Sequence, residues 1–221
     1  MEYFVANTFY EDYMELLISR VTHSTMSLEK DLGDPDDSKN AIRLWDNMKA
    51  FKYLIAHAEK QDKVTEELIV SVANLVNASS MYISDGYRKT GDYLAETSIP
   101  ISNPVNIRHD LLDLLDRYYN EWQDMDSFER EARFHIDFIR IHPFEDGNGR
   151  TARLFLNRNL MHQRIYPVII TTDLEEYYNS YIKDNDYEAM ANLFRIQSRK
   201  EYEVYQKLYN EYINQIEKVK K

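Results

Sequence analysis

The sequence predicts a largely α-helical fold, an all-α domain, on two observations. Apolar residues recur at helical spacing over most of the chain, as in Leu111, Leu114, Leu115 and Tyr118. Only 5 of its 221 residues are glycine, so few positions are marked for tight turns. We expect helices near residues 7–30, 38–60, 65–79, 107–124, 127–141, 150–163, 173–184 and 187–218.

The breaks between these helices follow from local sequence. Gly33-Asp34-Pro35 ends the first helix, and the polar cluster at 36–38 offers caps for the second. From about 80 to 106 the helical pattern gives way to turn and extended signals, which predict a β-hairpin or flap. The last helix carries an apolar stripe within 205–216 that we expect to pack on the core, with a dimer contact as the alternative.

The chain is long enough to bury one substantial core. Its hydrophobic content is 43%, and no linker rich in Pro, Gly or Ser divides it. We therefore expect a single domain over residues 1–221, with an N-terminal segment at 1–35, a core at 36–190 and a C-terminal helix at 191–221.

Composition and charge also argue against several kinds of site and partner. The chain has no cysteine, so disulfides and thiolate metal sites are excluded, and a reducing compartment suits it. Neither an export signal nor a run of 18 apolar residues is visible. A net charge of -11 disfavours binding to nucleic acid or to an anionic membrane. We expect a cytoplasmic protein without either partner.

The chemistry is concentrated in twelve residues, 142–153, which read His-Pro-Phe-Glu-Asp-Gly-Asn-Gly-Arg-Thr-Ala-Arg. The run follows one apolar helix and precedes another, so its glycines fall at a helix N-terminus. Backbone amides are free there, and the helix dipole is positive. Gly147 and Gly149 flank Asn148, which lets the three amides form an anion-binding nest. The run predicts a phosphate site.

Side chains in the same run supply the rest of a reaction. Arg150 and Arg153 lie on one face of the following helix and can reach the same polyphosphate. Asp146 is the carboxylate placed to hold Mg²⁺, and His142 suits proton acceptance near neutral pH. Phe144 is the apolar anchor of the loop. Together they predict attack by a hydroxyl on a nucleotide phosphate, the alternative being a plain glycine-rich loop between helices.

The run is similar to the signature of the Fic family, His-x-Phe-x-(Asp/Glu)-Gly-Asn-Gly-Arg-x-x-Arg, at every specified position. The resemblance implies a helical domain that moves AMP from ATP, with Mg²⁺, to a Tyr, Thr or Ser hydroxyl of a protein and releases pyrophosphate. It implies His142 as the base, Asp146 as the Mg²⁺ ligand and Asn148 with the loop amides on the α-phosphate. Arg150 and Arg153 would take the β- and γ-phosphates. AMP removal and a catalytically silent nucleotide-binding module remain alternatives.

Downstream, residues 176–185 resemble the Fic segment that lines the adenine and ribose pocket. This resemblance implies that Tyr177 or Tyr178 contacts the base and that Asn185 hydrogen-bonds the base or the sugar. Tyrosines packed in the core are the alternative. His135 is a weak candidate for a metal ligand, because it has no cluster of other ligands near it in sequence.

Thr25 and Glu29 stand one helical turn apart in the first helix. They resemble the inhibitory pattern (Ser/Thr)-x-x-x-Glu-(Gly/Asn) of many Fic proteins, although Lys30 departs from it. The resemblance implies that Glu29 pairs with Arg153 and blocks placement of the γ-phosphate. The alternative is an ordinary solvated glutamate.

The stretch from about 94 to 104 resembles the Fic flap, a hairpin edge to which a target protein adds a strand. The residues expected to hold the target are Thr97, Ser98, Ile99, Pro100 and Ile101. A plain exposed hairpin is the alternative. The target could be the protein itself, and the sequence leaves a homo-oligomer open.

Overall fold

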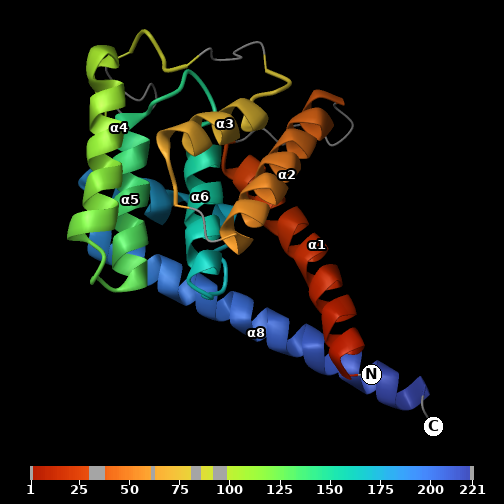
Figure 1. The fold of residues 1–221 in the computed structure, drawn as a ribbon. Coiled ribbons are helices and arrows are strands. Elements are labelled where there is room, and N and C mark those ends of the chain that lie inside the picture. The colour runs from red at the N-terminus through yellow and green to blue at the C-terminus, as the bar shows by residue number, and fades with distance from the viewer. Residues whose placement is uncertain (1, 30–37, 61–62, 81–85, 92–98, 220–221) are drawn as a thin grey trace.

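The computed structural model describes all residues except 1, 30–37, 61–62, 81–85, 92–98 and 220–221. The described part is helical (Figure 1), as the sequence predicted. Its α-helices are α1 (Glu2–Leu28), α2 (Ser38–Glu59), α3 (Glu66–Val76), α4 (Ile107–Asp116), α5 (Ser127–Ile141), α6 (Asn148–His162), α7 (Glu175–Asp184) and α8 (Tyr187–Val219). Short 3-10 turns at Pro104–Asn106 and Thr172–Leu174 precede α4 and α7.

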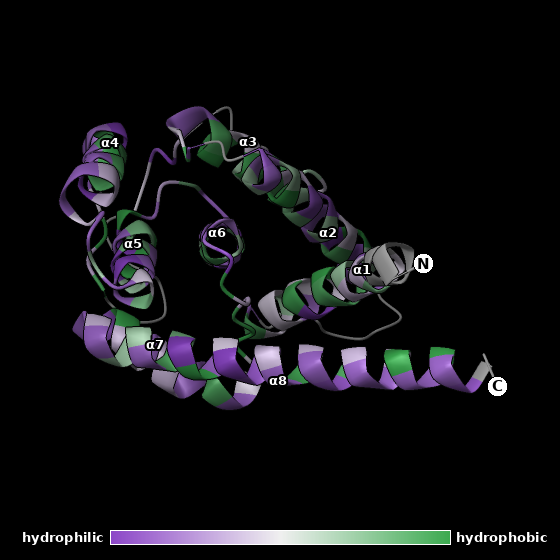
Figure 2. Ribbon diagram, turned by 60° about the horizontal axis from the view of Figure 1, so that its bottom comes forward, coloured by the Kyte–Doolittle hydropathy of each residue, from purple (hydrophilic) through white to green (hydrophobic). Residues whose placement is uncertain are grey.

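Helix α6 is the centre of the fold. It contacts α1, α2, α3 and α5, and Figure 2 looks nearly along it with these helices around it. Twelve of its fifteen residues are buried, including charged Arg150, Arg153 and Arg158. Because α6 is enclosed on all sides, the groups at its N-terminus are held by several different elements. That end carries the predicted site.

The N-terminal helix is fixed to the C-terminal one. Tyr13 and Arg20 of α1 both donate to Oε1 of Glu201 in α8, at 2.9 and 2.8 Å. The ring of Phe9 packs on the tyrosines of the apolar stripe of α8, with centroid distances of 5.4 Å to Tyr205 and 5.2 Å to Tyr209. The stripe therefore packs within the domain, mainly against α1. The two helices run together at their outer ends (Figure 1), and this contact directs the other end of α1 toward α6.

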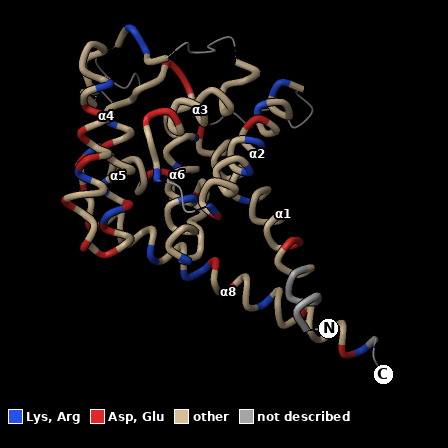
Figure 3. The backbone as a smooth tube through the Cα atoms, viewed as in Figure 1, with Lys and Arg blue, Asp and Glu red and all other residues tan. Residues whose placement is uncertain are grey.

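The predicted helices are confirmed, with differences at several of their limits; for example, α3 ends at Val76 where the prediction extended to 79. The first begins at Glu2, and the sixth begins at Asn148, two residues earlier than expected. The helix expected over 107–124 changes after Asp116 into one π-turn, Arg117–Glu121. Charges of both signs follow one another along α4, α5 and α8 (Figure 3), which is typical of solvated helix faces. Within the described residues, none of the helices is long and apolar enough to cross a membrane.

The β-hairpin expected between 80 and 106 is not shown. Residues 92–98, with Thr97 and Ser98, lie outside the described part, which contains no β-strand beyond an isolated bridge at Pro100. Ser102 donates its backbone N–H to the carbonyl of Arg140 at 3.1 Å, so the segment after 98 runs beside α5. Ile99 is only 4% exposed. Its side chain faces the core, so any contact of Ile99 with a target would be made by its backbone, as strand addition requires.

Candidate active site

The loop between α5 and α6 has an unusual backbone at both ends. His142 ends α5 in the left-handed region with φ of 49°, and Gly147 precedes α6 with φ of 77°. A Cβ added at Gly147 would lie 2.8 Å from Oδ1 of Asn77, so only glycine fits this approach. The loop can therefore turn tightly enough to present the first amides of α6, which have no helical acceptor.

The loop is braced from within. Asn148 accepts a hydrogen bond from the backbone N–H of Phe144 at 2.9 Å and donates to its carbonyl at 2.7 Å. Phe144 is fully buried, and its ring lies on that of Tyr87 with centroids 6.1 Å apart. The side chain of Asn148 is thus committed to the loop. The contact of Asn148 with a phosphate therefore stays a prediction for its backbone amide.

A second brace joins the loop to α3. Arg150, 1% exposed, forms an ion pair with Oδ1 of Asp146 at 3.0 Å and donates to Oδ1 of Asn77 at 3.2 Å. Asn77 in turn donates to the carbonyl of Asp146 at 2.9 Å. Arg150 therefore points toward α3 and the loop, which differs from the expectation that it shares a polyphosphate with Arg153. Sequence analysis missed Asn77, because nothing near residue 77 marks it.

Asp146 is suited to a Mg²⁺ ion whose other ligands are water and phosphate oxygens. Its carboxylate is partly exposed, and the Gly147 amide and the Arg150 guanidinium both contact Oδ1. In the described part of the chain, no group of three or more His, Asp or Glu side chains could hold a metal. An ion here would take one oxygen from Asp146 and the rest from phosphate and water, as Mg²⁺ does.

Arg153 faces the opposite way, toward the end of α1. Its guanidinium forms a short ion pair with Oε1 of Glu29 and donates to the hydroxyl and carbonyl oxygens of Thr25, at 3.4 and 3.2 Å. A Cβ added at Gly149 would collide with the Glu29 carboxylate, which shows how closely Glu29 approaches the N-terminus of α6. The structure thus brings together Thr25, Glu29 and Arg153. Lys30 lies outside the described residues.

His142 is held as a neutral base. Burial and the nearby Arg88 guanidinium lower its pKa to about 4, although the carboxylates of Glu29 and Asp146 act in the opposite sense. Arg88 donates to the carbonyl of His142 at 2.6 Å and to that of Thr90 at 2.9 Å. A neutral imidazole can accept a proton at pH 7. Arg88 is a second residue that sequence analysis missed; only its place between turn residues hinted at a fixed position.

The comparisons with known proteins agree with this geometry. A family model described as the Fic/DOC family matches residues 63–160, which run from the start of α3 through most of α6. This chain contains a Fic domain. Protein adenylyltransferase fic-1 of Caenorhabditis elegans is 31% identical over 125 residues, covering 56% of this chain and 24% of that protein. Protein adenylyltransferase Fic of Nematostella vectensis is 30% identical over 128 residues, covering 54% and 28%. The chain thus spans about a quarter of the length of these relatives.

Solved structures share the fold. A Fic domain-containing signaling protein from Bacteroides thetaiotaomicron superposes with a TM-score of 0.82 at 16% identity, covering 91% of this chain and 90% of the other. Fic-1 from C. elegans superposes with a TM-score of 0.75 at 20% identity, covering 91% and 66%. Both identities are low, so these matches support the architecture of the Fic domain.

The tyrosines expected to line a nucleotide pocket have different surroundings. Tyr177 is 59% exposed, and Asn185 ends α7 on the surface with φ of 54°. Tyr178 is only 3% exposed, and its hydroxyl lies 2.6 Å from Nε2 of His135 and 3.4 Å from Nη1 of Arg153. Tyr178 therefore faces the interior, and of the two tyrosines expected near the base Tyr177 is the exposed one. His135 is buried beside Tyr178 and has no cluster of metal ligands around it in the described residues.

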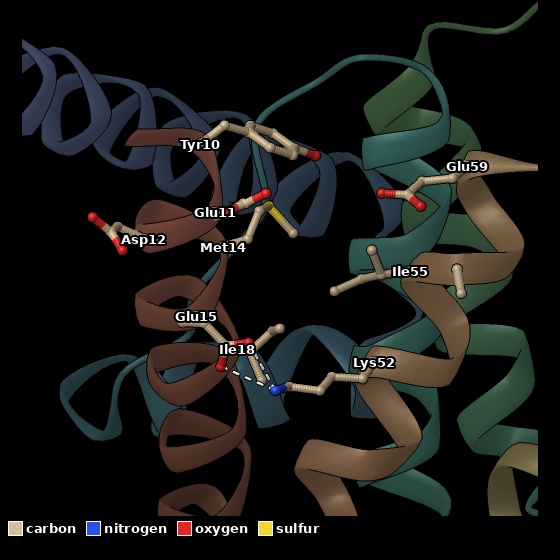
Figure 4. Close-up of a pocket in the computed structure, with 10 residues that line it drawn as sticks. Tyr10, Glu11, Asp12, Met14, Glu15, Ile18, Lys52, Ile55 and Glu59 are labelled. Atoms are coloured by element: carbon tan, nitrogen blue, oxygen red, sulfur yellow. Dashed lines mark hydrogen bonds and ion pairs between the residues drawn. The ribbon is translucent and has the colours of Figure 1, made fainter. Parts of the chain in front are cut away.

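A separate hollow of about 570 Å³ lies between α1 and α2 (Figure 4). Met14, Ile18 and Ile55 give it an apolar side, and Lys52 reaches across from α2 to Glu15 at 2.8 Å. The residues that line it include none of the predicted site residues. The site therefore consists of the 142–147 loop, the start of α6 and the end of α1.

Proposed function

We propose that this Fic domain is a protein adenylyltransferase that moves AMP from ATP to a hydroxyl of a protein. The proposal rests above all on the placement of His142, which ends α5 at the start of the loop that leads into the first amides of α6. The names of relatives that match over half of this chain support the same chemistry. A proton acceptor beside an anion-binding helix N-terminus is what hydroxyl attack on a phosphate requires.

The reaction assigns a role to each part of the loop. The target hydroxyl oxygen bonds to the α-phosphorus while the bond from that phosphorus to the bridging oxygen of pyrophosphate breaks. His142 takes the hydroxyl proton, and the amides of Asn148 and Gly149 bind the α-phosphate oxygens. Asp146 would hold Mg²⁺, which would neutralise charge on the phosphates and on the leaving pyrophosphate. Arg150 acts mainly by fixing Asp146.

In this proposal Glu29 inhibits AMP transfer. Its carboxylate pairs with the guanidinium of Arg153, which would otherwise bind the β- or γ-phosphate. Its contact with Gly149 also places negative charge beside the amides that would receive ATP. Tyr177 and Asn185 are the proposed base and sugar contacts. Pro100 and Ile101, with Thr97 and Ser98, are proposed to hold the target.

The test is intact-mass spectrometry of the Glu29→Gly protein incubated with ATP and Mg²⁺, beside the same protein carrying His142→Ala. We expect a gain of one AMP unit that requires His142, with ATP binding unchanged in the His142→Ala protein. Equal AMP transfer with and without His142 would refute its role. ATP binding without pyrophosphate release, even with added protein substrates, would favour a silent nucleotide-binding module. Release of AMP from a modified protein would favour AMP removal.

A further inference from the structure

Arg153 has partners on two sides, and they differ in character. On the α1 side lies Glu29, whose side chain is 30% exposed and which stands in a turn at the end of the helix. Thr25, which is 2% exposed, lies on the same side and accepts from the guanidinium through its hydroxyl and carbonyl oxygens. On the opposite side lie Tyr178 of α7 and His135 of α5, which are 3% and 1% exposed. The Glu29 side chain can leave without opening the core, whereas the three buried residues cannot.

Protonation limits the possible directions of these hydrogen bonds. Burial lowers the pKa of His135 to about 3, so its ring is neutral at pH 7 and one of its two nitrogens can accept. Burial raises the pKa of Tyr178, so the phenol keeps its proton. In the tautomer of His135 that carries its proton on Nδ1, the hydroxyl of Tyr178 donates to Nε2 across 2.6 Å. Its oxygen is left as an acceptor for the guanidinium of Arg153, whose Cζ also lies 6.0 Å from the ring centroid.

We propose that His135 and Tyr178 are positioning residues that anchor Arg153 whether or not Glu29 is in place. His135 orients the hydroxyl of Tyr178, and that hydroxyl holds the guanidinium at the N-terminal part of α6. When Glu29 is removed, Arg153 therefore keeps its position and can bind the phosphates of ATP. Glu29 blocks Arg153 without being needed to position it. This inference rests on the proposed function for its phosphate ligand and on the described contacts for the anchor itself.

The anchor predicts a selective loss of nucleotide affinity. In the Glu29→Gly background, Tyr178→Phe removes one oxygen and retains the ring. Because Arg153 would contact only the β- and γ-phosphates, we expect the dissociation constant for ATP to rise about tenfold, as expected for one hydrogen bond to a charged group. The constant for AMP should change less than twofold. Tyr181→Phe on the same helix is the matched control and should leave both unchanged.

Two substitutions of His135 test whether it acts by accepting a hydrogen bond from Tyr178 or only by packing against it. His135→Gln keeps an acceptor near the position of Nε2, whereas His135→Phe keeps a ring without one. We expect the glutamine variant to retain most of the ATP affinity and the phenylalanine variant to show the loss seen for Tyr178→Phe. Equal weakening of ATP and AMP, or unchanged ATP affinity in Tyr178→Phe, would overturn the anchor.

A measurement without nucleotide keeps the anchor testable if the proposed function fails. The Nε–H signal of Arg153 can be followed by ¹⁵N nuclear magnetic resonance in the Glu29→Gly protein. We expect one sharp signal, protected from exchange with water, that broadens or loses its protection in Tyr178→Phe but not in Tyr181→Phe. A signal unaffected by Tyr178→Phe would refute the anchor. Absence of ATP binding would count against the proposed function alone.

Discussion

The two sides of α6 use the same residue type for different purposes. Arg150 faces α3, where it ties Asp146 to Asn77, and all these partners belong to the loop or to the helix that packs on it. Arg153 faces α1 and α7, where its ionic partner is Glu29 at the end of a terminal helix. Both arginines are almost completely buried. The comparison shows that Arg150 is tied into the loop while Arg153 pairs with a partly exposed carboxylate, and in the proposed function a phosphate would replace that carboxylate.

Replacement of each arginine by methionine should distinguish the roles of Arg150 and Arg153 most clearly. Arg150→Met leaves Asp146 without its buried cation, so we expect the free energy of unfolding to fall by about 3 kcal/mol. Arg153→Met leaves a partly exposed Glu29 and a tyrosine still bonded to His135, so the fall should be about 1 kcal/mol. Urea denaturation measures both values. Equal losses would show that the two arginines are equivalent structural supports.

The next largest effect is expected in the dependence of transfer on pH. With the pKa of His142 lowered to about 4, transfer by the Glu29→Gly protein should be constant from about pH 6 to 8 and decline toward pH 4, where the base becomes protonated. Loss of a nearby positive charge favours the protonated form. Arg88→Met should therefore raise the pKa of His142 and move this decline to higher pH.

The exposed Arg108, which pairs with Glu66, is the control for Arg88. Arg108→Met should leave the pH profile unchanged, because its charge lies in a separate ion pair. A profile that does not move in Arg88→Met would remove Arg88 from the electrostatics of the site. A profile centred near pH 6.5 in the Glu29→Gly protein would contradict the burial of His142.

The smallest effect is expected on stability, from a substitution at Gly149 in the first turn of α6, where Glu29 approaches it. Gly149→Ala should destabilise the parent protein by about 1 kcal/mol, because the added methyl group collides with the Glu29 carboxylate and lies 3.0 Å from Nη1 of Arg153. The same substitution in the Glu29→Gly background should cost less, since the carboxylate is gone. The difference between the two costs, measured by thermal or urea unfolding, reports the contact directly. Equal costs would show that Glu29 does not occupy this position in solution.

The sequence predicted features that depend on spacing along the chain. Helical periodicity predicted the eight α-helices, and the run at 142–153 placed His142 and Asp146 in the loop between α5 and α6. The turn between Thr25 and Glu29 predicted a pair with Arg153 that the structure contains. Each of these features is encoded within a few neighbouring residues or in a specific motif.

Other features depend on contacts between distant segments, and periodicity does not encode them. Arg88 reaches the end of α5 across 54 positions, and Asn77 reaches the loop across 69. Tyr177 and Tyr178 are neighbours on α7, where successive side chains point in different directions, so Tyr178 faces His135 while Tyr177 is exposed. The side chain of Asn148 bonds the backbone of Phe144, a contact that the glycine-flanked motif does not reveal.

The proposed inhibition of AMP transfer by the Glu29–Arg153 ion pair is tested most directly by initial rates. The rate of AMP transfer is measured for the parent protein, Glu29→Gln and Glu15→Gln. Glu15 also lies on α1 and also forms an ion pair, with Lys52, so its substitution removes the same charge from the same helix. We expect the rate to rise at least about tenfold for Glu29→Gln, corresponding to loss of roughly 1.4 kcal/mol of inhibition, and to stay unchanged for Glu15→Gln. Equal rates in all three proteins, or equal gains in both variants, would contradict the proposed inhibition.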